Sequence, residues 1–137
     1  MALDVGDRRI GVALSDPSGM LASPLTTINR TLSVDEDITA ILELARKQGA
    51  GEIVVGIPKP LAGGSSPQTK ATDRFYRALA AKSSVPVKRW DERLSTVEAE
   101  RRLIEAGVEP SREKGRVDAA AAAVILQSYL DRPRARR

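Results

Sequence analysis

The chain has 137 residues, of which 42% are hydrophobic and 29% charged, as expected of one folded domain with its own core. It contains no Cys and no His, which excludes disulfides, thiolate or imidazole metal sites, Cys nucleophiles and Ser-His-Asp hydrolysis. An enzyme of this composition must use carboxylates, hydroxyls, Lys, Arg or a bound cofactor.

The basic charge of the chain is concentrated at its C-terminus. Residues 132–137 contain four Arg, which equal the whole formal net charge of +4, so residues 1–131 are formally neutral. We expect residues 1–131 to form the domain and residues 132–137 to be a disordered basic tail. Such a tail suits a polyanionic partner, although it also suits simple solvation of the chain. The few aromatic residues argue against a base-stacking platform: Phe75, Tyr76, Trp90 and Tyr129.

Neither a membrane span nor a signal peptide is visible. The longest apolar stretch, Ala119–Leu126, is too short to cross a bilayer, and the first residues lack the basic-then-apolar order of a signal peptide. We therefore expect a cytoplasmic protein with no membrane partner. The first apolar segment begins at Met1, only three residues before Asp4, which is short for a strand. A longer version of the chain could therefore have further residues upstream.

The first third of the chain predicts a strand meander. Met1–Val5 and Ile10–Leu14 are short apolar runs separated by Gly6-Asp7-Arg8-Arg9, a pattern typical of a β-hairpin. Leu25–Asn29 is expected to add a third strand to this antiparallel sheet.

A helix follows the meander. Ser33 and Glu36 form a capping box, and Gly49 provides a stop signal. Between them, apolar residues recur at the spacing i, i+3, i+4, i+7, which places them on one helix face: Ile38, Ile41, Leu42 and Ala45.

The middle of the chain predicts a parallel strand-helix-strand unit. Glu52–Pro58 is an apolar run without alternation, as expected of a strand buried on both faces. After the loop Lys59–Ser66, a helix begins at Pro67 with Ser66 as its N-cap. Val85–Trp90 is the next strand, joined by a right-handed crossover. The predicted apolar face of this helix is Ala71, Phe75, Ala78 and Leu79.

Two further helices complete the predicted fold. A second capping box, Ser95 to Glu98, begins a helix that ends before Gly107 and has Ala99, Leu103 and Ala106 in line. The last helix, Val117–Leu130, is apolar almost all round and should be buried. The expected fold class is α/β: a mixed five-stranded sheet, with three antiparallel and then two parallel strands, flanked by helices.

Three acidic positions stand out from the 18 acids of the chain. Asp4 lies inside a strand, where an acid is unfavourable. Asp91 and Glu92 end a parallel strand, at the sheet edge where α/β proteins gather ligands. Asp118 lies near the start of a helix that must be buried, and a lone buried carboxylate there is costly. Each also has a structural explanation, respectively a turn residue, a solvated strand end and an acid favoured by the helix dipole.

Together these acids indicate metal-dependent chemistry. A hard cation such as Mg²⁺ prefers oxygen ligands. Two such ions about 4 Å apart can activate water for phosphodiester hydrolysis, which needs neither His nor Cys. Alternation along the strand sends Asp91 and Glu92 to opposite faces but does not say which of them faces Asp4.

Five segments of the chain resemble, in order, the pattern of the YqgF/RuvX family, and W-D-E-R-L-S-T is the most specific of them. They are L-D-V-G-D-R-R-I-G-V-A-L-S-D-P (Leu3–Pro17), A-S-P-L-T-T-I (Ala22–Ile28), I-V-V-G-I-P (Ile53–Pro58), W-D-E-R-L-S-T (Trp90–Thr96) and V-D-A-A-A-A-A-V-I-L-Q-S-Y-L (Val117–Leu130). The resemblance covers essentially the whole chain up to the tail.

This resemblance implies the ribonuclease H-like fold of the RuvC resolvases and the activity of an endonuclease. Members of the family are assigned to 5′-end maturation of pre-16S ribosomal RNA or to Holliday junction resolution. By resemblance, the catalytic acids and metal ligands are Asp4, Glu92 and Asp118, with Mg²⁺ or Mn²⁺ as cofactor. The implied partner is structured RNA or branched DNA, and junction resolution would require a homodimer. The loop Lys59–Ser66 departs from the N-x-D-G-T-like stretch usual in the family, so no substrate contacts are carried over to it.

Further residues are candidates for contact with nucleic acid. Gly6 lacks a Cβ, so a phosphate can approach its backbone closely. Arg8, Arg9 and Arg93 can bind phosphate in a bidentate manner, although surface Arg that only solvate the fold are about as common. Thr96, in the first turn of its helix, can hydrogen-bond a phosphate.

Two other classes of protein remain open. The D-x-G hairpin is also typical of the phosphate loop in the actin, sugar kinase and chaperone ATPase superfamily, whose members hold ATP between two domains. A catalytically inert nucleic-acid-binding module is the other alternative. Metal-dependent cleavage that EDTA abolishes would separate a nuclease from such a module, and stabilisation by ATP would indicate the nucleotide-binding class.

Overall fold

The computed structural model describes residues 1–94, 97–107 and 114–133, with backbone alone for 114–116. The strands are β1 (Ala2–Val5), β2 (Arg9–Ser15), β3 (Ala22–Asn29), β4 (Ile53–Ile57) and β5 (Val87–Asp91). The helices are α1 (Val34–Gln48), α2 (Pro67–Lys82), α3 (Val97–Glu105), α4 (Lys114–Leu130) and the short 3₁₀ helix η1 (Glu92–Leu94).

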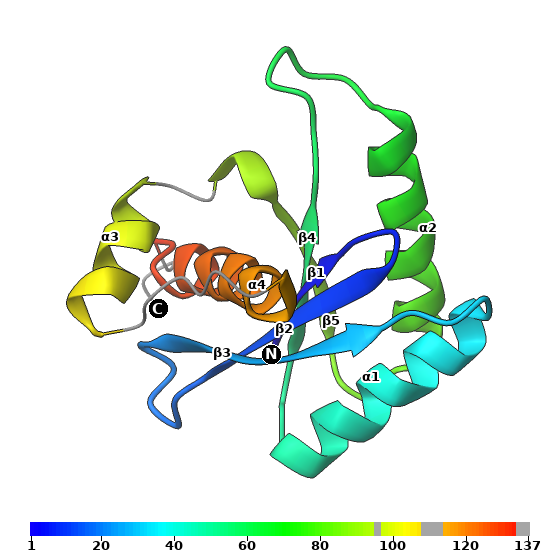
Figure 1. Cartoon of the computed structure of the whole chain (residues 1–137), viewed down its shortest axis with the longest axis horizontal. Helices are drawn as coiled ribbons and strands as arrows, with labels where there is room; N and C mark the ends of the chain where they lie inside the picture. The colour runs from blue at the N-terminus through cyan, green and yellow to red at the C-terminus, as the bar shows by residue number, and fades with distance from the viewer. Residues whose placement is uncertain (95–96, 108–113, 134–137) are drawn as a thin grey trace.

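The five strands form one mixed sheet in the order β3-β2-β1-β4-β5 (Figure 1). β1, β2 and β3 pair antiparallel, whereas β4 pairs parallel with both β1 and β5. The predicted architecture of three antiparallel and then two parallel strands is therefore confirmed. All five residues of β4 are buried, as the run without alternation predicts.

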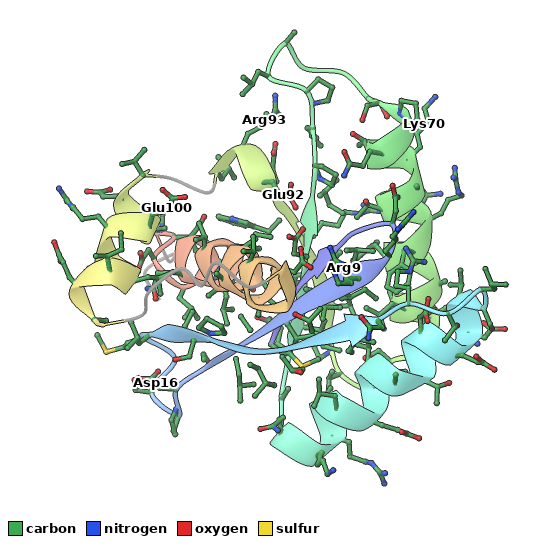
Figure 2. The ribbon with its side chains drawn as sticks, in the orientation of Figure 1. Arg9, Asp16, Lys70, Glu92, Arg93 and Glu100 are labelled. Atoms are coloured by element: carbon green, nitrogen blue, oxygen red, sulfur yellow. The ribbon has the colours of Figure 1, made fainter. Side chains whose placement is uncertain are left out.

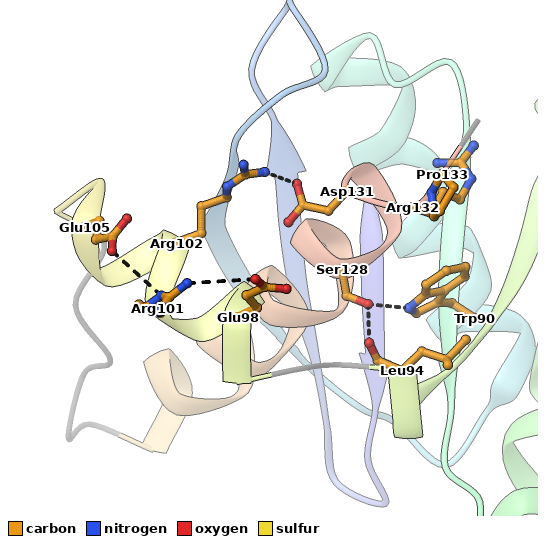
Figure 3. Close-up of a pocket in the computed structure, with 10 residues that line it drawn as sticks. All are labelled: Trp90, Leu94, Glu98, Arg101, Arg102, Glu105, Ser128, Asp131, Arg132 and Pro133. Atoms are coloured by element: carbon orange, nitrogen blue, oxygen red, sulfur yellow. Dashed lines mark hydrogen bonds and ion pairs between the residues drawn. The ribbon is translucent and has the colours of Figure 1, made fainter. Parts of the chain in front are cut away.

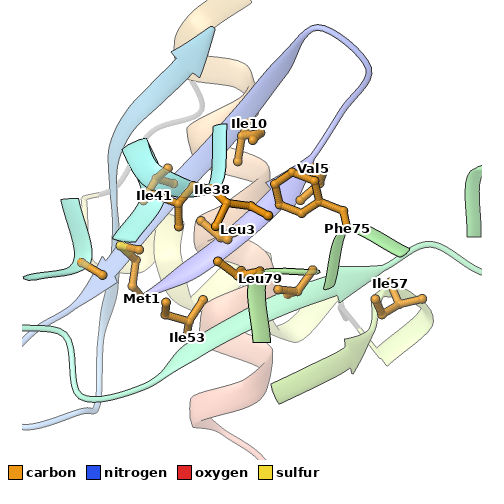
Figure 4. Close-up of a cluster of buried hydrophobic side chains, with 13 residues drawn as sticks. Met1, Leu3, Val5, Ile10, Ile38, Ile41, Ile53, Ile57, Phe75 and Leu79 are labelled. Carbon is orange, nitrogen blue, oxygen red and sulfur yellow. The ribbon is translucent and has the colours of Figure 1, made fainter. Parts of the chain in front are cut away.

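Helices cover both faces of this sheet. α1 and α2 pack on one face and enclose the larger core, which includes Leu3, Ile10, Ile41 and Phe75 (Figure 4). α4 covers the other face, with α3 outside it (Figure 1). Alternation along β1 thus sends Leu3 toward the α1 and α2 core and leaves its neighbours on the α4 side.

Small residues allow α4 to lie directly on the sheet. Ala119, Ala122 and Ala123 are buried beneath the helix. At Gly11 of β2, a Cβ would lie only 1.9 Å from the backbone carbonyl oxygen of Asp118. The close approach of helix and strand therefore requires glycine at this position.

The helix caps agree with the capping predictions. Ser33 Oγ accepts a hydrogen bond of 3.3 Å from the Glu36 N–H, and Ser66 Oγ accepts one of 3.1 Å from the Thr69 N–H. Gly49 ends α1 in the left-handed conformation, with φ of 68°. Ser95 of the second predicted capping box lies outside the described residues.

Some element boundaries and one helix face differ from the predictions. β3 begins at Ala22 and includes Pro24, which an edge strand tolerates because its outer N–H groups need no partner. β5 begins at Val87, after Pro86, and α4 begins three residues before Val117. Ala71 was predicted on the buried face of α2, but it is exposed. Two threonines share the buried face with Phe75 and Leu79, and the hydroxyl of one of them, Thr69, donates to the carbonyl of Pro58.

Within the described part of the chain, no helix is long and apolar enough to cross a membrane.

At the C-terminal end of α4, the Arg132 guanidinium lies 3.7 Å from the centre of the Tyr129 ring.

Candidate active site

Asp4 and Glu92 meet on the α4 side of the sheet. Asp4 occupies the middle of β1, and Glu92 directly follows β5, at the start of η1. β4 lies between these two strands, and its Gly56 leaves room for the Glu92 side chain, because a Cβ there would lie 3.0 Å from Glu92 Oε1. The two carboxyl groups are in hydrogen-bonding contact with each other.

This contact changes the titration of both groups. Burial raises the pKa of Asp4, and the negative charge of Asp118 raises it further. Burial and the charge of Asp4 raise the pKa of Glu92 to about 7. Two carboxylates this close cannot both ionise easily, so near neutral pH the pair tends to hold one shared proton.

Asp118 lies beside this pair but is directed toward a different partner. Arg9 Nε, at the start of β2 (Figure 2), donates a hydrogen bond of 2.8 Å to Asp118 Oδ2. The Asp118 charge still acts on Asp4, as the raised pKa of Asp4 shows. Among the described residues, no three acidic side chains converge closely enough to form a ready-made metal-binding group. The structure thus joins two of the three predicted acids and places the third next to them, in an ion pair.

Asp91 points to the opposite face of the sheet. Its carboxylate accepts hydrogen bonds from Arg93 Nε and from Arg93 Nη2, the latter at 2.7 Å, and from the Arg93 backbone N–H at 2.9 Å. These bonds lower the pKa of Asp91, and the charge of Lys59 adds to the effect. Arg93, a predicted phosphate contact, is therefore engaged with its neighbour Asp91.

Two of the remaining predicted contacts, Gly6 and Arg8, lie in the turn of the β1–β2 hairpin. The Gly6 N–H donates a 2.9 Å hydrogen bond to the Arg9 carbonyl, and a Cβ on Gly6 would lie 2.9 Å from that same oxygen. Glycine is therefore required by the turn itself. Arg8 is exposed and forms no ion pair with a described residue. Thr96 lies outside the described residues.

An ion pair with a buried acid supports this hairpin, and its two residues are not among the predicted site residues. Asp37, only 1% exposed, accepts 3.1 Å and 2.8 Å hydrogen bonds from Arg30 Nε and the Thr31 N–H. Burial alone would raise the pKa of Asp37, but these bonds lower it overall. Arg30 Nη1 also donates to the Gly6 carbonyl at 3.0 Å. The detectable signal was an acid next to Ile38, on the buried stripe of a predicted helix.

Comparison with solved structures defines the class of fold. RuvC of Thermus thermophilus superposes with a TM-score of 0.58 at 16% identity, over 93% of this chain and 92% of that one. The same protein in complex with a Holliday junction substrate gives 0.59, over 93% and 90% of the two chains. The chain therefore has the ribonuclease H-like fold of RuvC, with an acidic pair at the centre of its sheet.

The sequence identifies the family within this class. Residues 1–132 match the family model described as "RuvX: Holliday junction resolvase", and the chain belongs to this family. A relative from Halothermothrix orenii is 49% identical over 131 residues, covering 96% of this chain and 93% of its own. One from Moorella thermoacetica is 48% identical over 132 residues, covering 96% and 94%. Both relatives carry the name "Putative pre-16S rRNA nuclease". The predicted family is confirmed.

Proposed function

We propose that this protein is an endonuclease that hydrolyses phosphodiester bonds in pre-16S rRNA, with Asp4, Glu92 and Asp118 as its catalytic acids. The observation that carries the proposal is the partly buried contact between Asp4 and Glu92. Bringing two carboxyl groups together away from water destabilises the fold, so the contact calls for a functional explanation. The names of the relatives supply the substrate.

The chemistry of these side chains fits a divalent cation such as Mg²⁺ or Mn²⁺. Carboxylate oxygens are the ligands that hard cations prefer, and a cation would offset the repulsion within the pair. Asp4 and Glu92 would hold it, and Asp118 would join them after release from Arg9. When bound, one or two such ions polarise the phosphodiester and lower the pKa of a bound water.

The residues of the chain have separate roles in this proposal. Asp4 and Glu92 release their shared proton before they act as ligands. Arg9 neutralises Asp118 while that acid has no cation to bind, and its guanidinium then becomes available to a phosphate oxygen. Hydrolysis adds water across one P–O bond, so that one strand end carries the phosphate and the other a hydroxyl.

The test is cleavage of an rRNA precursor fragment with Mg²⁺ or Mn²⁺. We expect cleavage by the native protein, none in EDTA, and none by Asp4→Asn or Glu92→Gln. Asp91→Asn is the matched control, because it removes a charge next to Glu92 but on the other face of the sheet. This control should retain much of the activity and lose about 1 kcal/mol of stability, a typical value for lost hydrogen bonds.

Two outcomes would contradict the proposal. An active Glu92→Gln together with an inactive but folded Asp91→Asn would move the site to the other acid. Binding of RNA without any metal-dependent cleavage would make the protein an inert nucleic-acid-binding module.

Branched DNA is the second candidate substrate, because the matching family model is described as a Holliday junction resolvase. Resolution needs two coordinated cuts, and therefore a symmetric dimer. A four-way junction assayed beside the rRNA fragment, with the molecular mass measured by light scattering, separates the two substrates. Cleavage of the junction by a dimer, with the rRNA left intact, would favour the resolvase.

A further inference from the structure

A cavity of about 350 Å³ lies between β5 and the first half of α2, beneath the loop that follows β4. We call it the α2–β5 cavity. Its cationic lining residues are Lys59, Lys70 and Arg89, and its acidic ones are Asp73 and Asp91. Gly64 lines it in the left-handed conformation, and a Cβ there would meet nothing within 4 Å, so this side of the cavity is not covered. The cavity is therefore open to an incoming group.

Both acids of the α2–β5 cavity are already neutralised by arginines. Asp73 binds Arg77 at 3.0 Å and Arg89 at 2.9 Å, and Asp91 binds Arg93 at 2.7 Å. Lys59 and Lys70, in contrast, form no ion pair with any described residue. The lining thus has an excess of positive charge, which a bound anion would compensate.

A second cavity does not share this property. It has about 620 Å³ and lies between α3 and α4 (Figure 3). It is lined by three arginines and three acids: Arg102 pairs with Asp131 and Arg101 with both Glu98 and Glu105, while Arg132 packs on the Tyr129 ring. A cavity whose charges match in number gives no preference for an anion, in contrast to the α2–β5 cavity.

The position of the α2–β5 cavity connects it to the acidic pair. Asp91 lines the cavity on the α2 face of the sheet, and the next residue, Glu92, contacts Asp4 on the α4 face. Figure 2 shows Lys70 on α2 and Glu92 near the sheet. Both sites are at the carboxyl ends of β4 and β5, the edge where ligands of such sheets bind. A strand lying across this edge can therefore reach both.

We propose that the α2–β5 cavity binds a backbone phosphate of the nucleic acid, flanking the phosphodiester bond presented to Asp4 and Glu92. This rests on the proposed nuclease function. Lys59 and Lys70 supply the charge from the loop and from the helix. Arg89 is held in place by Asp73 and lies 4.3 Å from the centre of the Tyr76 ring, so it forms the fixed wall of the site. Because every nucleotide carries a phosphate, the site recognises backbone and not base.

The test compares the double variant Lys59→Gln, Lys70→Gln with the native protein. Binding to a labelled single-stranded RNA, and to DNA of the same sequence, is measured in EDTA at several salt concentrations. Losing one phosphate contact should lower the slope of log binding constant against log salt concentration by about 0.7. If the variant and the native protein bind equally at about 1 M salt, the variant then binds about fivefold more weakly at about 0.1 M salt. The loss should be equal for RNA and DNA, and melting temperatures should stay unchanged because both lysines are exposed.

The matched control is the double variant Arg46→Gln, Lys47→Gln, which removes the same charge from the last turn of α1. That turn leads into the start of β4, at the opposite edge of the sheet from the cavity. We expect its salt slope to match that of the native protein.

The inference would be overturned by an unchanged slope in the cavity variant, an equal fall in the control, or no binding by the native protein in EDTA. A loss on RNA alone would also overturn it, in favour of a site for the 2′-hydroxyl. These readouts need no cleavage, so the inference and the nuclease function can fail separately. If the protein cleaves, the cavity variant should show a raised KM with kcat largely kept.

Discussion

Replacing Glu92 by Gln should stabilise the metal-free protein at alkaline pH and have much less effect at acidic pH. The ordinary pKa of 4.5 rises to about 7 in the folded chain, through burial and the charge of Asp4. A group whose folded pKa is raised stabilises the fold below its unfolded pKa, and this contribution is lost as the pH rises through the folded value. The native free energy of unfolding should therefore fall between about pH 5 and pH 8 on account of this group.

The magnitude follows from this shift. A shift from 4.5 to about 7 corresponds to at most about 3.4 kcal/mol at pH 8, at 1.36 kcal/mol per pKa unit. Glu92 is only partly buried, and solvent screening reduces this to about 1–2 kcal/mol. Glu92→Gln should thus be more stable than the native protein by about that amount at pH 8, and by about a quarter of it at pH 5.

Urea unfolding at pH 5 and pH 8, in EDTA and with Mg²⁺, measures these differences directly. Comparing the variant with the native protein at each pH cancels the titration of the groups that do not interact with Glu92. Mg²⁺ should reverse the order, because it stabilises the native protein through a ligand that the variant lacks. A variant that is less stable than the native protein by the same amount at both pH values would refute the reasoning, since Glu92 would then be an ordinary structural hydrogen-bonding group.

Three other changes test separate parts of the structure. Gly11→Ala forces a methyl group against a carbonyl oxygen of α4 and should lower the free energy of unfolding in urea by about 3 kcal/mol or more. The control Gly51→Ala faces open space and should lower it by under about 0.5 kcal/mol. Asp37→Asn leaves the Arg30 charge poorly compensated, so the free energy of unfolding should fall by about 2–3 kcal/mol and KM should rise because the β1–β2 hairpin loosens. An unchanged urea midpoint would show that the ion pair is dispensable. Deleting residues 134–137 removes three Arg and should lower the salt slope for duplex nucleic acid by at most about 2.7, with the melting temperature unchanged; an equal slope would mean that the tail only solvates the chain.

Much of the fold could be predicted from local patterns in the sequence. The capping box at Ser33, the stop at Gly49 and the uniformly apolar run in β4 each depend on residues within one turn or one strand. The order of strands and helices then leaves few possible sheets. Boundaries were less predictable, because Pro24 is compatible with β3 only at the edge of the sheet.

The candidate site shows the limit of local patterns more clearly. Asp4, Glu92 and Asp118 could be selected from the sequence, by position and by family resemblance. Alternation along β5 showed that Asp91 and Glu92 face opposite ways, but it did not show which of them meets Asp4. The tertiary structure decides this, because β4 places Gly56 between β5 and β1 and so leaves space for Glu92 alone.

The ion pair between Arg9 and Asp118 was also beyond reach of the sequence, since 109 positions separate the two residues. The same is true of the α2–β5 cavity, whose lysines come from a loop and from a helix. Secondary structure depends on side chains a few positions apart, so the sequence displays it directly. Charge pairing and cavities depend on which surfaces the packed sheet and helices bring together, and only the tertiary structure determines that.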